Sequence, residues 1–282
     1  MANEIRTVCF DSDLKIEAYR FEGIMQKFPN HFHDYYVIGF IENGQRYLQC
    51  NNHEYIVKAG DLVVFNPMDT HTCEQADGKP LDYRSINVQP EIMQKAVLEI
   101  TGDDRMPRFT QTVLYRSELA GCLHDLHLMI LEEATDFKKE ELFLLLIEQL
   151  LRECSDAPIS VLPTEPALMM KTVCDYLETN YAKTITLDDL SELAGLSKYY
   201  FLRSFTRQKG ISPYSYLETI RIGRAKKLLE KGVPPIDVAF QTGFSDQSHF
   251  SNFFKKLIGL TPKQYMKIFT GDTRSPLEDS AN

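Results

Sequence analysis

The sequence predicts a two-domain α+β protein, with an N-terminal β-barrel carrying dimerisation helices and an all-α C-terminal domain of two helix-turn-helix units. Three observations support this division of the 282-residue chain. Short aromatic and β-branched runs fill roughly the first 90 residues, helical periodicity begins near residue 89, and the net charge changes sign along the chain. The expected parts are a first domain, a linker, a second domain and a disordered tail: 1–155, 156–166, 167–270 and 271–282.

The composition excludes several classes of protein. Its 43% hydrophobic and 25% charged residues are ordinary for a globular chain. The longest purely apolar run, residues 142–147, is far shorter than the ~20 residues of a membrane-spanning helix. The polar N-terminus predicts no secretory signal peptide. Six scattered cysteines without a CxxC pair predict reduced thiols in a cytoplasmic protein rather than a disulfide framework.

The first domain is expected to contain short strands separated by turn residues, at 35–42, 45–50, 54–57 and 62–65. The dipeptide Asn43-Gly44 predicts a hairpin between the first two of these strands. Strands of this length, with turn signals every ~8–12 residues, are typical of a small barrel or sandwich.

Three amphipathic segments follow, at 90–99, 116–134 and 137–154. The last of them is apolar on nearly its whole circumference, which indicates a buried helix. It could pack onto its own barrel, form the seam of a homodimer, or do both with different faces.

The charge is distributed unequally between the two domains. Residues 171–270 contain 15 Lys and Arg against 9 Asp and Glu, a net charge of +6. Residues 1–170 contain 15 against 28, a net charge of −13. This asymmetry predicts different partners, with a polyanion bound by the basic domain. The alternative is that surface charge varies along the chain by chance.

Within the basic domain, two segments each predict a pair of short helices joined by a glycine turn: 186–210 and 236–259. In the first pair Thr186 and Ser197 are expected to cap the helices. In the second pair Ser245 is expected to cap the second helix. A long amphipathic helix, at 213–231, separates the two pairs.

In each pair, two phenylalanines four residues apart predict the buried face of the second helix. The residues expected off that face are Lys198, Tyr199, Tyr200, Leu202, Arg203 and Arg207 in the first pair, and Gln247, Ser248, His249, Asn252, Lys255 and Lys256 in the second. Alternatively, Tyr199 and Tyr200 are packing residues and His249 is a structural one.

Residues 167–270 closely resemble the DNA-binding domain of the AraC/XylS family. The similarity rests on LSELAGLSKYYFLRSFTRQKGISPYSYL, on RIGRA at 221–225, and on IDVAFQTGFSDQSHFSNFFKKLIGLTPKQY. It implies a seven-helix module that places two recognition helices in successive major-groove turns of double-stranded DNA. By family position, the base-reading residues would be Tyr199, Leu202 and Arg203 in the first helix, and Gln247, Ser248 and Asn252 in the second. Many relatives have a basic residue at the position of Asn252, so the second helix is expected to bind phosphate more weakly here.

Residues ~10–95 resemble the cupin-like, ligand-sensing domain of AraC-type regulators, on HFHDYYVIGFIENGQRYL, AGDLVVFNPMDTHTC and LDYRSINV. The resemblance implies a small-molecule effector held in the barrel mouth. The candidate lining residues are His31, His33, Tyr35, Tyr47, His71 and Arg84. If Arg84 faces inward, it would clamp a carboxylate or phosphate.

Strand alternation places His31, His33, Tyr35 and Val37 on one face, so His31 and His33 could meet His71 at a metal ion. Metal-binding cupins usually supply a carboxylate where this sequence has Val37. We therefore predict no cofactor and no catalytic residue, and favour a cytoplasmic bacterial transcriptional regulator, a homodimer that could also contact RNA polymerase. The alternative is a metal-dependent cupin enzyme, or a metal or redox sensor, with His31, His33 and His71 as ligands.

Overall fold

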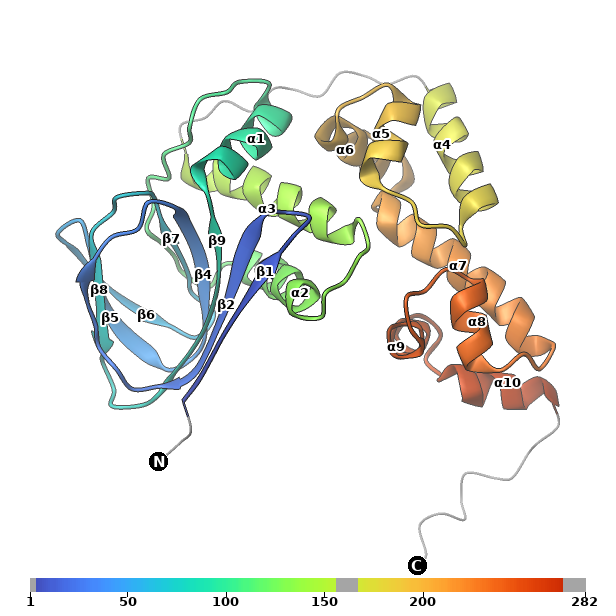
Figure 1. Ribbon diagram of the computed structural model, residues 1–282, viewed down its shortest axis with the longest axis horizontal. Helices are drawn as coiled ribbons and strands as arrows, with labels where there is room; N and C mark the ends of the chain where they lie inside the picture. Colours follow the sequence, from blue (N-terminus) through green and yellow to red (C-terminus); the bar gives the residue numbers. More distant parts are fainter. Residues whose placement is uncertain (1–3, 156–166, 271–282) are drawn as a thin grey trace, which may run out of the picture. The chain divides into compact units, whose positions relative to one another are not determined.

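The computed structural model describes residues 4–155 and 167–270 (Figure 1). The chain divides into two compact units, Met1–Pro163 and Thr164–Asn282, which are called the β unit and the helical unit below. The predicted linker 156–166 and the predicted tail 271–282 lie outside the described residues.

The β unit contains two antiparallel sheets. The strands of the six-stranded sheet are, in spatial order, β1 (Ile5–Asp11), β2 (Ile16–Ile24), β9 (Leu81–Val88), β4 (Tyr36–Asn43), β7 (Leu62–Phe65) and β10 (Val113–Leu114). Those of the four-stranded sheet are β3 (Phe28–His31), β8 (His71–Gln75), β5 (Gln45–Cys50) and β6 (His53–Lys58).

The predicted hairpin at Asn43-Gly44 is wrong. β4 pairs with β7 and β9, whereas β5 pairs with β6 and β8, so the chain changes sheets at Gly44. Gly44 has φ +87°, and a Cβ there would lie 2.3 Å from the carbonyl oxygen of Pro80. The hairpin instead joins β5 to β6 through Asn51 and Asn52, which both have positive φ, as a two-residue hairpin loop requires.

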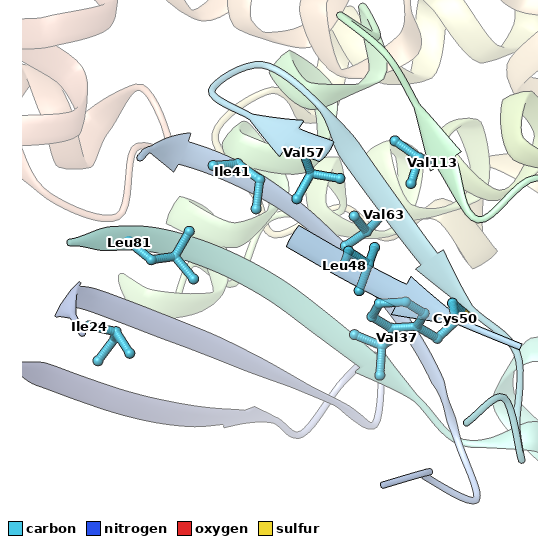
Figure 2. Close-up of a cluster of buried hydrophobic side chains, with 10 residues drawn as sticks. Ile24, Val37, Ile41, Leu48, Cys50, Val57, Val63, Leu81 and Val113 are labelled. Atoms are coloured by element: carbon cyan, nitrogen blue, oxygen red, sulfur yellow. The ribbon is translucent and has the colours of Figure 1, made fainter. Parts of the chain in front are cut away.

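Apolar side chains from both sheets meet between them. Figure 2 shows Val37 and Ile41 of β4 in one cluster with Leu48 of β5 and Val57 of β6. Each of these four side chains is at most 5% exposed. Because successive strand residues point to opposite faces, this inward set alternates with residues that face the helices or the surface.

Three helices cover the six-stranded sheet on the side away from the four-stranded sheet (Figure 1): α1 (Pro90–Thr101), α2 (Leu119–Leu131) and α3 (Lys138–Cys154). α2 lies on the strands, and α3 packs against α1 and α2. Most apolar side chains of α3 are buried, including Phe143, Leu146 and Leu150, so the packing interpretation of this helix is confirmed. Leu142 and Leu145 are half-buried, and the dimer seam stays a prediction.

Residues 167–270 form seven helices, the number that the family resemblance implied: α4 (Ala167–Asn180), α5 (Leu187–Ala194), α6 (Lys198–Lys209), α7 (Pro213–Glu230), α8 (Pro235–Gln241), α9 (Gln247–Ile258) and α10 (Pro262–Thr270). α5 with α6, and α8 with α9, are the two helix-turn-helix pairs, and α7 connects them (Figure 1). In the described part of the chain, no helix combines the length and the apolar character needed to span a membrane.

Candidate functional site

The first helix-turn-helix pair is fixed by the predicted caps. Thr186 and Asp189 form a capping box: the Thr186 hydroxyl accepts from the Asp189 backbone N–H at 3.1 Å, and the Asp189 carboxylate accepts from the Thr186 N–H at 2.9 Å. These bonds lower the pKa of Asp189. Gly195 ends α5 in the left-handed conformation, and Ser197 caps α6.

The predicted cap of the second pair is wrong by one residue. Asp246, not Ser245, caps α9, and its carboxylate accepts the His249 backbone N–H at 2.8 Å. This hydrogen bond lowers the pKa of Asp246. The turn before it needs Gly243, which has φ +85° and whose Cβ would lie 2.8 Å from the carbonyl oxygen of Tyr181.

The structure contradicts the prediction that Tyr199 and Leu202 face outward on α6. Their side chains are 0% and 1% exposed. Leu202 lies about 60° around the helix from Phe205, so it belongs to the flank of the buried face. Tyr199 packs edge-on against the ring of Tyr200, with centroids 5.7 Å apart.

The other predicted residues of α6 keep accessible surface. Lys198, Tyr200 and Arg203 are half-buried, and Arg207 is exposed. Lys198 forms an ion pair with Asp188 at 2.9 Å, which joins the two helices of the pair. The accessible cations of α6 besides Lys198 are therefore Arg203, Arg207 and the exposed Lys209 in the last turn.

On α9 every predicted residue but one is exposed: Gln247, Ser248, Asn252, Lys255 and Lys256. His249 is half-buried, and its Nε2 lies 3.8 Å from the Glu218 carboxylate on α7. Its ring also packs edge-on against Phe244. These contacts favour the structural interpretation of His249, which holds α9 against α7.

Sequence reasoning missed the role of Arg221, the first residue of the RIGRA motif. Its side chain is 3% exposed and donates to the carbonyl oxygens of Tyr181 and Lys183, at 2.8 and 3.2 Å. The guanidinium also lies 5.8 Å from the ring centroid of Phe244. Arg221 thereby connects the loop between α4 and α5 to the turn of the second pair.

The β unit contains a cavity of about 250 Å³ between its sheets. Apolar and aromatic side chains form most of the wall, including the residues of Figure 2 named above. Among the described lining residues none is acidic, Lys or Arg. The polar groups are those of Tyr19, His31, His33, Tyr35, His71, Tyr83, Ser85 and Asn87.

Two predicted lining residues lie elsewhere. Tyr47 is 48% exposed because its neighbours on β5, Arg46 and Leu48, take the inward positions. Arg84 points to the helical side of β9, opposite the lining residues on either side of it, and pairs with Glu42 at 2.7 Å. Arg84 therefore cannot clamp an anion inside the cavity.

The other four predicted residues, His31, His33, Tyr35 and His71, do line the cavity. The ligand nitrogens of the three histidines all lie within 4.8 Å of one another. Burial away from water lowers the pKa of His71 to about 4 and also lowers that of His33, because burial disfavours the charged ring. The three imidazoles thus form one end of the cavity.

A glycine on β4 leaves room for one of the lining side chains. A Cβ at Gly39 would lie 2.1 Å from the hydroxyl oxygen of Tyr83, so only glycine leaves room for this ring across the strand. Tyr83, Ser85 and Asn87 were not predicted, although alternation along β9 places all three on one face.

Two family models match the chain in these regions. One, an AraC-like ligand binding domain, covers residues 13–147, and the other, a helix-turn-helix domain, covers residues 190–268. YbfI of Bacillus subtilis (strain 168), named as an uncharacterized HTH-type transcriptional regulator, is 64% identical over 249 residues, which are 88% of this chain and 90% of YbfI. The chain belongs to the AraC family of DNA-binding transcriptional regulators.

This AraC-family chain is also similar to the HTH-type transcriptional activator RhaS of Escherichia coli (strain SMS-3-5), at 25% identity over 84% of this chain and 86% of RhaS. Among solved structures, apo ToxT from Vibrio cholerae strain SCE256 covers 90% of this chain with 98% of its own, at 15% identity and a TM-score of 0.39. The cavity and the histidines lie in the region matched as the ligand-binding domain, and α6 and α9 in that matched as the helix-turn-helix domain.

Proposed function

We propose that this AraC-family regulator reads double-stranded DNA with α6 and α9 and binds its effector in the cavity of the β unit. The observation that carries the proposal is the pair of capped helices with accessible polar faces, both within residues 171–270, which have a net charge of +6. A helix of this size fits the major groove, where polar side chains read base edges and cations hold phosphates.

Each residue class has a distinct role at this interface. Arg203 can donate two hydrogen bonds to a guanine, and the amides of Gln247 and Asn252 suit adenine. Arg207, Lys255 and Lys256 are exposed cations placed for phosphates. The helix between the pairs, α7, has 18 residues. Its length of about 27 Å is comparable to the ~34 Å turn of DNA that separates successive major grooves.

The cavity favours a small effector with an aromatic or aliphatic body. Its volume of about 250 Å³ and mainly apolar wall suit such a molecule better than a sugar, which needs many hydrogen-bonding partners. The effector can shift the DNA-binding equilibrium only to the extent that it binds one arrangement of the protein more tightly than another. We assign the cavity to regulation, not catalysis, because the relatives are named as transcriptional regulators.

We further propose that the regulator is a cytoplasmic homodimer and contacts RNA polymerase when bound to DNA. The half-buried Leu142 and Leu145 lie three residues apart on α3 and form the dimer surface in this proposal. The double substitution Leu142→Glu with Leu145→Glu should convert the full chain to monomers in sedimentation velocity, without loss of its thermal unfolding transition. A variant that remains a dimer would assign dimerisation to another surface.

Selection of binding sequences from a random DNA pool tests the DNA-binding part of the proposal. The full chain should enrich one sequence that contains two recognition sites per protomer. The two sites should be separated from each other by about one helical turn of DNA. The same protein, screened for thermal stabilisation by small aromatic and aliphatic compounds, should respond to one class of them and change its DNA affinity with that class. Failure to enrich any sequence would contradict the assignment of α6 and α9.

A further inference from the structure

The three histidines of the cavity come from different parts of the chain but occupy one place. His31 ends β3 and is paired in register with His71 at the start of β8. His33 lies between β3 and β4, and its ring centroid is 4.8 Å from that of His31 and 5.2 Å from that of His71. Sheet pairing, rather than loop conformation, thus brings two of the rings together.

Hydrogen bonds define the tautomer of two of these rings. Nδ1 of His31 lies 2.6 Å from the carbonyl oxygen of Pro29, and Nδ1 of His71 lies 2.9 Å from that of Asp69. A carbonyl oxygen only accepts, so each Nδ1 must carry the proton. In the neutral form of either ring, Nε2 is then left with a lone pair. This arrangement, in which a backbone carbonyl orients the ring, is typical of histidines that bind metals.

Aromatic neighbours limit the movement of the rings. Phe65 stacks on His71 with centroids 4.0 Å apart and an interplanar angle of 7°. Tyr35 stacks on His33 at 4.8 Å. The three imidazoles are therefore held with one ring nitrogen of each within 4.8 Å of the others, at the end of a cavity whose described lining includes no Lys or Arg. Neighbouring lone pairs repel one another, so this arrangement favours a cation between them.

We propose that His31, His33 and His71 together bind one divalent transition-metal ion at this end of the effector cavity. Imidazole ligands suit Zn²⁺, Co²⁺, Ni²⁺ or Fe²⁺, whereas Mg²⁺ and Ca²⁺ prefer oxygen. In a tetrahedral zinc site the ligand nitrogens are about 3.4 Å apart. The observed nitrogens lie within 4.8 Å, and the half-buried His31 and His33 can close this difference by small rotations.

The site would differ in charge from a cupin metal site with a carboxylate ligand. Val37 takes the place of that carboxylate, and none of the described lining residues of the cavity is acidic. Three neutral ligands leave the ion its full positive charge and at least one open position facing the cavity. The inference rests on the proposed effector function and specifies it: the effector combines an apolar body with one anionic donor group that binds the metal.

The test uses Co²⁺ as the probe, because its visible absorption reports ligand number and geometry. The full chain is stripped with a chelator, dialysed, and titrated with CoCl₂, and metal content is measured after gel filtration. We expect one Co²⁺ per chain with an intense four-coordinate spectrum. His33→Ala should weaken Co²⁺ binding by at least about 100-fold. The His33 backbone carbonyl oxygen accepts from the Met68 N–H at 2.7 Å, a bond that alanine keeps, and no hydrogen bond of the His33 ring is found among the described residues. This variant should therefore keep its fold, as thermal unfolding can check.

His53 offers a matched control. Its Nδ1 also lies near the carbonyl oxygen two residues before it, Asn51, at 3.1 Å, but His53 is exposed and outside the cavity. His53→Ala should bind Co²⁺ as the unmodified chain does. Absence of stoichiometric Co²⁺, or equal binding by His33→Ala and His53→Ala, would overturn the metal site.

A second measurement tests the open position. Sodium azide, an anionic ligand for open cobalt positions, should change the visible spectrum of the Co²⁺ form, and an unchanged spectrum would overturn the anionic-effector part. DNA affinity of the metal-free chain is measured in parallel. If the chain binds DNA sequence-specifically but binds no Co²⁺, the proposed function stands and only the metal site is refuted. If it binds neither DNA nor Co²⁺, both the proposed function and the metal site are refuted.

Discussion

The two units of the molecule hold their candidate sites in opposite environments. In the β unit, aromatic and imidazole side chains converge from several strands onto a cavity of about 250 Å³. In the helical unit, amide, hydroxyl and cationic side chains project from the exposed faces of two helices. A small molecule can be surrounded and gains affinity from desolvation, whereas a duplex must be read from a protruding, positively charged surface.

The same contrast appears in the ionisable groups. In the β unit burial lowers histidine pKa values, to about 4 for His71 and for His127. In the helical unit the lowered pKa values belong to the carboxylates of Asp189 and Asp246, which cap helices. The β unit should therefore lose stability in mild acid, and the helical unit only at a pH low enough to protonate carboxylates. The difference teaches that one unit depends on keeping water out and the other on local caps and turns.

The largest expected effect tests the dependence of the helical unit on its turns. Gly243→Ala should lower the free energy of unfolding by about 3 kcal/mol, because a positive φ is strained for alanine and the new Cβ meets the Tyr181 carbonyl. Gly210→Ala is the control, since its φ is +74° with nothing within 4 Å of the added Cβ. Gly210→Ala should lower the free energy of unfolding by only about 1–2 kcal/mol. Equal losses in urea unfolding would show that the close approach to Tyr181 is unimportant.

The next effect tests the β unit. His127 is fully buried on α2, and its Nε2 lies 2.9 Å from the Tyr19 carbonyl oxygen on β2. Burial lowers its pKa to about 4, so its neutral form is stabilising at and above pH 6.5, its ordinary pKa. As the pH falls below 6.5 the unfolded state takes up a proton first, and this stability is lost until about pH 4.

The loss attributable to His127 should be about 2 kcal/mol between pH 7 and pH 5. His127→Gln, which keeps a side-chain donor for Tyr19 but cannot titrate, should flatten the pH dependence of the unfolding free energy by that amount. The exposed His53→Gln should leave it unchanged. An equally steep pH dependence in His127→Gln would assign the acid sensitivity to another group.

Sequence alone predicted the helical unit better, because its features are local. Thr186 and Ser197 cap their helices as predicted, and the single error in capping, Ser245 for Asp246, exchanged two adjacent residues that both favour caps. The burial of Leu202 was missed because the buried face of α6 is wider than the stripe defined by two phenylalanines.

The cavity was only half predictable. Alternation correctly grouped His31, His33 and Tyr35. It could not tell which face of a strand points inward, and so it misplaced Tyr47 and Arg84, each one position from an inward residue. The pairing of β9 between β2 and β4 joins segments that are far apart in the chain, and no local pattern predicts such pairing.

The next prediction compares the removal of one arginine from the helical unit with the removal of one from the β unit. Arg203→Ala should weaken specific DNA binding by about 1–3 kcal/mol and relax one base position, because it removes a bidentate donor. Arg105→Ala removes the same charge from the β unit, where Arg105 is exposed and pairs with Asp103. The DNA affinity of the Arg105→Ala variant, measured by fluorescence anisotropy, should equal that of the unmodified chain. A similar loss in both variants would indicate that net charge, not the position of Arg203, determines affinity.

The smallest effect distinguishes phosphate contacts from base contacts on α9. Lys255 and Lys256 are exposed in the last turn of the helix, where they would neutralise phosphates without reading sequence. Changing both to Ala should reduce the slope of log affinity against log salt by about 2, and weaken specific and non-specific DNA alike. Asn252→Ala should leave the slope unchanged and weaken only the specific sequence. If Asn252→Ala also lowered the slope of log affinity against log salt, we would conclude that α9 contacts only the phosphates of the DNA backbone. The reading of bases would then be assigned to α6.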